Sequence, residues 1–183
     1  TKRVDDMNVA IYCGSQLGKN TKYAEAAAEL GKVLAEQNIG IVYGGSNIGL
    51  MGKVADAALA QGGSVIGVMP GHLSKHERVH SSLTEIHIVN SMHTRKQKMV
   101  DLADAYIALP GGCGTMDEYF EVFTWAQINL HSKPVILYNI AGFYDALILH
   151  FERMLTDGFI REEQRPILKI ADSVESVLSH LHK

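Results

Sequence analysis

The chain has 183 residues, of which 46% are hydrophobic, and a formal net charge of −3. This size and apolar content suit one domain with a core of its own, and the slightly acidic balance gives no case for nucleic acid as a main partner. No apolar run approaches the roughly 20 residues that a membrane-spanning helix needs, so we expect no membrane partner.

The N-terminal half of the chain alternates between short apolar runs and longer helical patterns. Residues 1–6 are polar and are expected to be a disordered leader or an expression remnant, with one domain at 7–183. Strands are predicted at 8–13, 39–43, 64–69 and 84–89, and helices at about 22–37, 50–61 and 92–102. The polar segment 72–83 fits neither pattern.

The C-terminal half continues the alternation. Strands are predicted at 105–109 and 134–139, and helices at 119–128, at about 143–157 and at 173–182. Strands that alternate with helices indicate a parallel sheet covered on both faces. Because the chain is short for a closed eight-fold barrel, we predict a single-domain α/β fold, a Rossmann-like doubly wound parallel sheet with helices on both faces.

The two cysteines, Cys13 and Cys113, are a hundred residues apart, and neither belongs to a CxxC pair. Both are therefore expected to be reduced thiols. The start of the sequence has no signal-peptide pattern. Together these features predict a cytoplasmic protein.

Three of the predicted strands end in glycine, at Gly14-Ser15, at Gly44-Gly45 and at 111–114. The carboxyl ends of parallel strands share one edge of a sheet, and ligands bind at that edge. Three such loops together indicate a nucleotide-like ligand. None of them reads GxGxxG or GxxxxGK[ST], so a dinucleotide site or an ATP P-loop has no direct support.

The third loop belongs to the nine-residue motif 110–118, which reads strand, glycine turn, helix. Glycines let backbone N–H groups close around an anion, and the N-terminus of the following helix favours negative charge at the same place. Glu118 then adds a carboxylate. The residues alone support two interpretations of Glu118 equally: a catalytic acid, or the partner of Thr115 in a helix capping box.

Two cations, Arg95 and Lys96, fall near the start of the predicted helix 92–102. The helix dipole disfavours cations there, which hints at a bound anion. The residues by themselves favour a plainer interpretation, a pair of solvated surface charges.

Residues 76–80 spell HExxH, the pattern of zinc metalloproteases. The motif needs a stable helix and a third ligand, but this stretch is polar and follows Pro70-Gly71. We interpret it as a chance match and expect no metal. In the helix after the glycine motif, aromatic residues fall on several faces, which favours burial in the core or at a subunit interface.

The motif at 110–118 resembles the PGGxGTxxE motif of the LONELY GUY (LOG) family of cytokinin riboside 5′-monophosphate phosphoribohydrolases. The segments 43–52, 92–96 and 124–127 resemble the family's other hallmarks in the same order, and the resemblance covers roughly residues 8–160. Ser46 stands where a third glycine is usual, and we expect altered loop detail rather than lost binding.

The resemblance implies hydrolysis of the N-glycosidic bond of AMP or N6-isopentenyl-AMP, without a cofactor, to give a free base and ribose 5-phosphate. It implies homodimers, or larger assemblies of dimers, with sites near the subunit interface. Glu118 and Arg95 map onto catalytic positions. The substrate-binding positions that it implies are Gly14, Ser15, Gly44, Gly45, Met92, Lys96, Pro110, Gly111, Gly112, Cys113, Gly114, Thr115 and Thr124.

Two alternatives remain open on the sequence. A nucleotide or cofactor carrier of the same fold would need the glycine loops but not both Glu118 and Arg95. A broader nucleotide 5′-monophosphate nucleosidase shares the motif but usually has a much longer chain. The family's older label, lysine decarboxylase, would require a pyridoxal phosphate lysine, and no lysine is singled out for that role.

Overall fold

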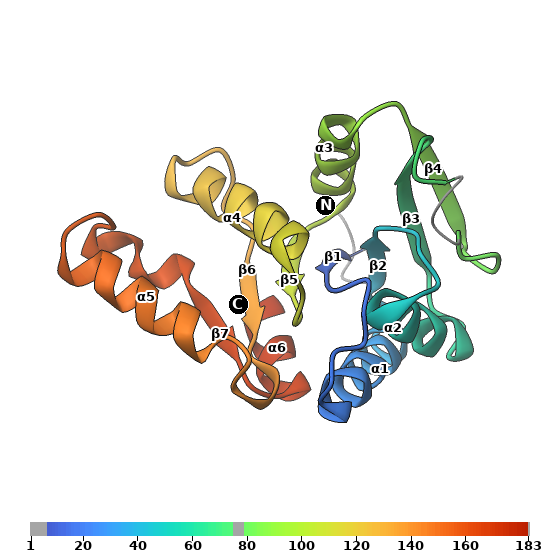
Figure 1. Cartoon of the computed structure of the whole chain (residues 1–183), viewed down its shortest axis with the longest axis horizontal. Coiled ribbons are helices and arrows are strands. Elements are labelled where there is room, and N and C mark those ends of the chain that lie inside the picture. The colour runs from blue at the N-terminus through green and yellow to red at the C-terminus, as the bar shows by residue number, and fades with distance from the viewer. Residues whose placement is uncertain (1–6, 75–78, 183) are drawn as a thin grey trace.

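The computed structural model describes residues 7–74 and 79–182, so the expected leader at 1–6 lies outside the described residues. Within them, seven parallel strands form one sheet in the order β4-β3-β2-β1-β5-β6-β7 (Figure 1). The strands are β1 (Asn8–Tyr12), β2 (Gly40–Tyr43), β3 (Val65–Pro70), β4 (Glu85–Val89), β5 (Ala105–Ala108), β6 (Val135–Tyr138) and β7 (Lys169–Ala171).

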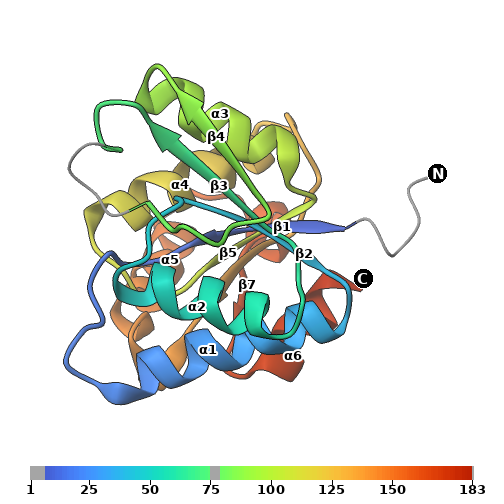
Figure 2. The ribbon, with the colours of Figure 1, turned by 90° about the vertical axis from the view of Figure 1, so that its right-hand side faces the viewer.

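Helices cover both faces of the sheet, each over its own hydrophobic core. Figure 2 shows α1, α2 and α6 on one face and α3 and α4 on the other. Helix α5 covers the same face as α3 and α4, because its Phe151 belongs to their hydrophobic core. This arrangement confirms the predicted doubly wound α/β fold. The helices are α1 (Thr21–Glu36), α2 (Gly49–Ala60), α3 (Met92–Leu102), α4 (Cys113–Gln127), α5 (Asp145–Thr156) and α6 (Val174–Leu181), with short 3₁₀ helices at Ile140–Gly142 and Glu162–Ile167. None of the helices in 7–74 and 79–182 has the length and hydropathy of a membrane crossing.

Strand β7 has no counterpart among the predicted elements. It is only three residues long, and it forms because Lys169 to Ala171 pair with Ile136 to Tyr138 of β6. A run this short has no periodicity of its own, and tertiary pairing decides its conformation. The other predicted strands and helices are present, with boundaries shifted by a few residues at most, except that α4 begins earlier than predicted.

The chain reverses its direction of winding at β1, which pairs with β2 on one side and β5 on the other. The loops that follow β1 and β5 therefore lead to opposite faces and leave a crevice between them, where ligands bind in open α/β sheets. Hydrogen bonds join all three glycine-loop regions there. The Gly14 N–H donates to the Pro110 carbonyl at 3.0 Å, and the Leu50 N–H donates to the Gly14 carbonyl at 3.1 Å. The predicted common edge is confirmed.

Candidate active site

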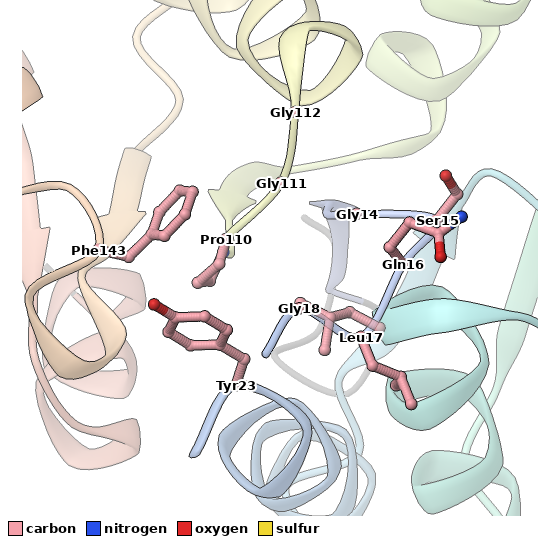
Figure 3. A pocket seen from close by; sticks show the side chains of 11 residues that line it. Gly14, Ser15, Gln16, Leu17, Gly18, Tyr23, Pro110, Gly111, Gly112 and Phe143 are labelled. Carbon is pink, nitrogen blue, oxygen red and sulfur yellow. The ribbon is translucent and has the colours of Figure 1, made fainter. Parts of the chain in front are cut away.

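A cavity of about 310 Å³ opens where the loops after β1 and β5 diverge (Figure 3). Five residues expected at the site line it: Gly14, Ser15, Pro110, Gly111 and Gly112. The fold thus brings two glycine loops, almost a hundred positions apart in the sequence, to the wall of one cavity. Glu118 and Arg95 are not part of this wall. They lie on the α3 and α4 side of the sheet edge.

The rest of the wall was not predicted from the sequence. Tyr23 from α1 and Phe143 after β6 face the cavity (Figure 3), with their rings edge to face at a centroid distance of 5.6 Å. Neither position carries a motif, and only folding brings them together. The unpredicted lining residues are Gln16, Leu17, Gly18, Tyr23, Leu50 and Phe143.

Helix α4 begins at Cys113, with Gly112 as its N-cap and no side chain capping it. The capping box proposed for Thr115 and Glu118 is therefore wrong. The glycine-rich turn lets the helix begin two residues before Thr115, which is buried inside the first turn. Glu118 therefore has no capping role.

The motif glycines differ in what surrounds them. A Cβ on Gly111 would collide with the Thr115 side chain and crowd the Gly14 backbone, so the fold itself requires glycine there. A Cβ on Gly112 or Gly114 would meet no described atom within 4 Å. The Cβ positions of these two exposed glycines are therefore open. The N–H groups of the first turn of α4 have no intrahelical acceptors and face outward.

Arg95 is buried, so the interpretation as a solvated surface charge is wrong for it. Its Nε donates to the Val68 carbonyl at 2.9 Å and its Nη2 donates to the Gly44 carbonyl at 3.0 Å. A Cβ on Gly44 would collide with the guanidinium. The loop after β2 therefore holds Arg95 in place, and it does so through a glycine.

Lys96 is not a free surface charge either. Its ammonium bonds Glu121 at 2.9 Å and Asp117 at 3.2 Å, which ties α3 to α4. The hydrogen bond to Glu121, followed by that to Asp117, raises the pKa of Lys96 against the effect of its desolvation. A Schiff-base lysine needs the opposite, a lowered pKa that frees the neutral amine. Lys96 is thus unsuited to decarboxylase chemistry.

Glu118 has the electrostatics of an acid–base group. Burial raises its pKa from 4.5 to about 7, and the positive charge of Arg95 opposes that rise. Asp117 raises the pKa further, while Lys96 lowers it. A carboxyl group with a pKa near neutrality can exist in either protonation state at physiological pH, which is a property of catalytic acids and bases.

The raised pKa predicts a pH-dependent cost to stability. Glu118 ionises at pH about 7 in the folded protein instead of 4.5. The stability that the protonated carboxyl group contributes is therefore fully present below pH 4.5 and is lost as the pH rises through about 7. Glu118→Gln removes the charge. At about pH 8 we expect it to raise the free energy of unfolding by up to about 3 kcal/mol. At about pH 4 the difference should vanish.

Urea unfolding of both proteins at the two pH values measures this effect. An equal difference at both values would show that it comes from packing and not from ionisation of Glu118.

The loop after β2 contains the departure from the usual glycine, Ser46. Ser46 is fully buried, and its hydroxyl accepts the Ile48 N–H at 3.4 Å. Gly45, beside it, has φ +85°, a conformation that glycine adopts without strain. The loop therefore accommodates the serine. Gly44 lies against Arg95, and Gly45 lies against β3.

Eight of the thirteen expected substrate-binding residues do not line the cavity: Gly44, Gly45, Met92, Lys96, Cys113, Gly114, Thr115 and Thr124. Met92 is the first residue of α3, and Thr124 lies in the second half of α4; both are exposed, and neither lines the cavity. Phe120 and Phe123 of α4 pack on Phe151 of α5 in the same chain. Burial in the core therefore accounts for part of the aromatic content of α4.

The HExxH sequence falls mostly outside the described residues, which omit 75–78. The described histidine of the pattern, His80, bonds Asp56 at 2.8 Å. Within 7–74 and 79–182, no group of three or more His, Cys, Asp or Glu side chains is arranged to hold a metal ion.

Comparison with solved structures shows the same fold in carrier proteins. The molybdenum cofactor carrier protein of Chlamydomonas reinhardtii superposes with a TM-score of 0.74 at 18% identity, over 97% of this chain and 96% of that one. The molybdenum cofactor binding protein of Rippkaea orientalis gives 0.70 at 22%, over 95% and 94%. At these identities the likeness concerns the fold alone.

Sequence comparison goes further. A protein-family model described as "Possible lysine decarboxylase" matches residues 51–181. The cytokinin riboside 5′-monophosphate phosphoribohydrolase of Rhodococcoides fascians is 41% identical over 94% of this chain and 87% of its own length. The enzyme LOG of Oryza sativa, with the same activity in its name, is 44% identical over 96% of this chain and 72% of its own. The chain belongs to the LOG family of cytokinin riboside 5′-monophosphate phosphoribohydrolases.

Proposed function

We propose that this protein hydrolyses the N-glycosidic bond of adenosine 5′-monophosphate, with or without an N6-prenyl group, and releases the free base and ribose 5-phosphate. One observation carries the proposal beyond family membership: the carboxyl group of Glu118 has a pKa of about 7 and is influenced most, among nearby charges, by the buried Arg95. A carrier protein has no need of such a pair.

The chemistry assigns a role to each group. As the glycosidic bond breaks, its electron pair goes to the base and positive charge develops on the ribose. The ionised Glu118 stabilises that charge. Glu118 also orients the water that attacks C1′ and accepts its proton. The departing base takes a proton from solvent, and Glu118 then releases its own proton to solvent, so the net reaction consumes one water molecule. Arg95, held by the carbonyls of Val68 and Gly44, contacts the substrate and positions the carboxylate.

The 5′-phosphate binds at the start of α4 in this proposal. The N–H groups of Gly112 to Thr115 belong to its first turn and are free to donate. The open space at Gly112 and Gly114 supports a ligand at this place, because nothing in the protein fills it. Ser15 and Gly14 face the same crevice from the loop after β1.

Two glycine substitutions separate binding from folding. We expect Gly114→Ala to leave stability unchanged or to raise it by up to about 1 kcal/mol, because alanine favours helix, and to raise KM for AMP about tenfold or more because its methyl group enters the phosphate space. Gly111→Ala should instead destabilise the fold through its collision with Thr115 and Gly14.

Urea unfolding and steady-state kinetics of both variants distinguish the two effects. An unchanged KM in Gly114→Ala would place the phosphate elsewhere.

The activity itself is tested by incubating the protein with AMP, N6-isopentenyl-AMP, GMP and CMP and assaying free base and ribose 5-phosphate. We expect release from the adenine nucleotides and little from GMP or CMP. Binding without release of any base would favour the carrier alternative, and release from all four would favour a broader nucleosidase.

We further propose a homodimer in the cytoplasm, with each site near the subunit interface. Met92 and Thr124, both expected at the substrate, are exposed on α3 and α4 outside the cavity of their own chain. This position supports a site that a second copy completes. Cys13 and Cys113 are both free thiols, which agrees with a reducing compartment. Light scattering of the purified protein measures the assembly, and a monomer with full activity would contradict the shared site.

A further inference from the structure

Residues 79–82, which follow β3 in the chain, lie against the loop that holds Arg95. Val79 forms an antiparallel bridge with Ser46, and the His80 N–H donates to the Gly45 carbonyl at 3.0 Å. The Tyr43 hydroxyl donates to the Ser46 carbonyl at 3.0 Å. The loop at 44–46 is thus covered by a segment that is distant from it in sequence.

The side chain of His80 fixes that segment to helix α2. The imidazole is buried, and its Nε2 lies 2.8 Å from Oδ1 of Asp56 in α2. Its Nδ1 accepts the Ser82 N–H at 3.2 Å. A neutral ring with its proton on Nε2 satisfies both contacts at once. His80 thus joins three parts of the structure. Its side chain bonds α2 and Ser82, and its backbone N–H bonds the loop after β2.

Two consecutive carbonyls of this loop then have different anchors. The Gly44 carbonyl accepts from Arg95 Nη2, and the Gly45 carbonyl accepts from the His80 N–H. Glycine restricts the backbone less than any other residue. The hydrogen bonds to both carbonyls therefore restrict two successive glycines whose backbone would otherwise reorient easily. If the anchor on Gly45 loosens, the Gly44 carbonyl moves with it, and Arg95 loses one of its two backbone acceptors.

We propose that His80 and Asp56 are positioning residues for the hydrolysis: they hold the Gly44–Ser46 loop and, through it, orient Arg95 toward the substrate. The inference rests on the proposed function, which gives Arg95 its role. It also gives a function to the one described histidine of the HExxH sequence, as a hydrogen-bonded anchor.

Kinetics of four variants test the pair. We expect His80→Ala to lower kcat for AMP about tenfold while KM changes less than about twofold, because the arginine is misplaced but the phosphate site is intact. Asp56→Ala should behave similarly, and the double variant should be no worse than His80→Ala alone, because both changes break one link. Asp56→Asn should retain activity, since its amide oxygen still accepts from Nε2. His180→Ala, which also removes a hydrogen-bonded imidazole but one that lies on α6 and bonds the Ile170 carbonyl, is the matched control.

Two further measurements separate positioning from general destabilisation. The charge of Arg95 lowers the pKa of Glu118, so a displaced Arg95 should move the acid limb of the kcat/KM profile to higher pH in His80→Ala. Amide exchange in the peptide that covers 44–46 should accelerate in His80→Ala and remain unchanged in His180→Ala.

The inference is overturned if His80→Ala keeps the kcat and acid limb of the wild type, or if the losses in the double variant simply multiply. If the wild-type protein releases no base, the proposed function fails. Amide exchange then still decides on the anchor: unchanged exchange at 44–46 in His80→Ala overturns it.

Discussion

Replacement of Glu118 by alanine is expected to lower kcat for base release from AMP by at least about 10³-fold, while the protein stays folded. The substitution removes the carboxylate to which the proposed function assigns two roles, stabilising the developing positive charge and activating water. It leaves the proposed phosphate site at the start of α4 intact, so the substrate should still bind. Single-turnover release of adenine measures the chemical step, and equilibrium binding of AMP measures the affinity of the phosphate site.

A neighbouring carboxylate provides the control. Asp117 is exposed and bonds Lys96 at 3.2 Å, and Asp117→Asn leaves Lys96 its 2.9 Å bond to Glu121. We expect its kcat to stay within about fivefold of the wild type, because exposed ion pairs contribute little. Unchanged turnover in Glu118→Ala would refute the catalytic assignment and leave the carrier alternative in its place.

The pH dependence of kcat/KM follows from the same residue. This ratio reports ionisation in the free enzyme, where the pKa of Glu118 is about 7. The proposed role requires the carboxylate. Activity should therefore fall as the pH drops below about 7, in proportion to the fraction of Glu118 that is protonated. A profile that is flat down to pH about 5 would contradict Glu118 as the ionising group.

The second large effect is expected at Arg95. Arg95→Ala should lower kcat/KM about 10²-fold or more, because it removes the proposed substrate contact and the positive charge that lowers the pKa of Glu118. It also leaves the buried carbonyls of Val68 and Gly44 without their donor, at a cost of about 1–3 kcal/mol for each unsatisfied group. Arg95→Lys should recover little, because an ammonium cannot reproduce the two-pronged geometry of the guanidinium.

Gln97, exposed on the same helix and bonded to Asp101, provides the comparison for Arg95. Gln97→Ala should change kcat/KM by less than about twofold and stability by less than about 0.5 kcal/mol. Steady-state kinetics and urea unfolding of the three variants measure both effects. If Arg95→Ala lost stability but kept full kcat/KM, Arg95 would be a structural residue only.

The sequence by itself determined the fold class, and it predicted the edge of the sheet at which a ligand would bind. Alternating apolar and helical patterns are local properties, and they predicted the parallel sheet because each run must bury one or both of its faces. The glycine runs after β1, β2 and β5 predicted the edge of the sheet at which the loops meet, since parallel strands share that edge. The motif at 110–118 predicted a helix N-terminus for an anion and the carboxylate next to it.

Only the tertiary structure decided how these residues act. The local sequence favours a surface position for Arg95. It is buried instead, because Val68 and Gly44, which are distant in the chain, present carbonyls to it. The raised pKa of Glu118 is a sum of burial and of charges from α3 and α4. The His80–Asp56 contact spans 24 positions. Such effects depend on distances between segments that no local pattern encodes, so the sequence indicates the reactive groups and folding alone determines their surroundings.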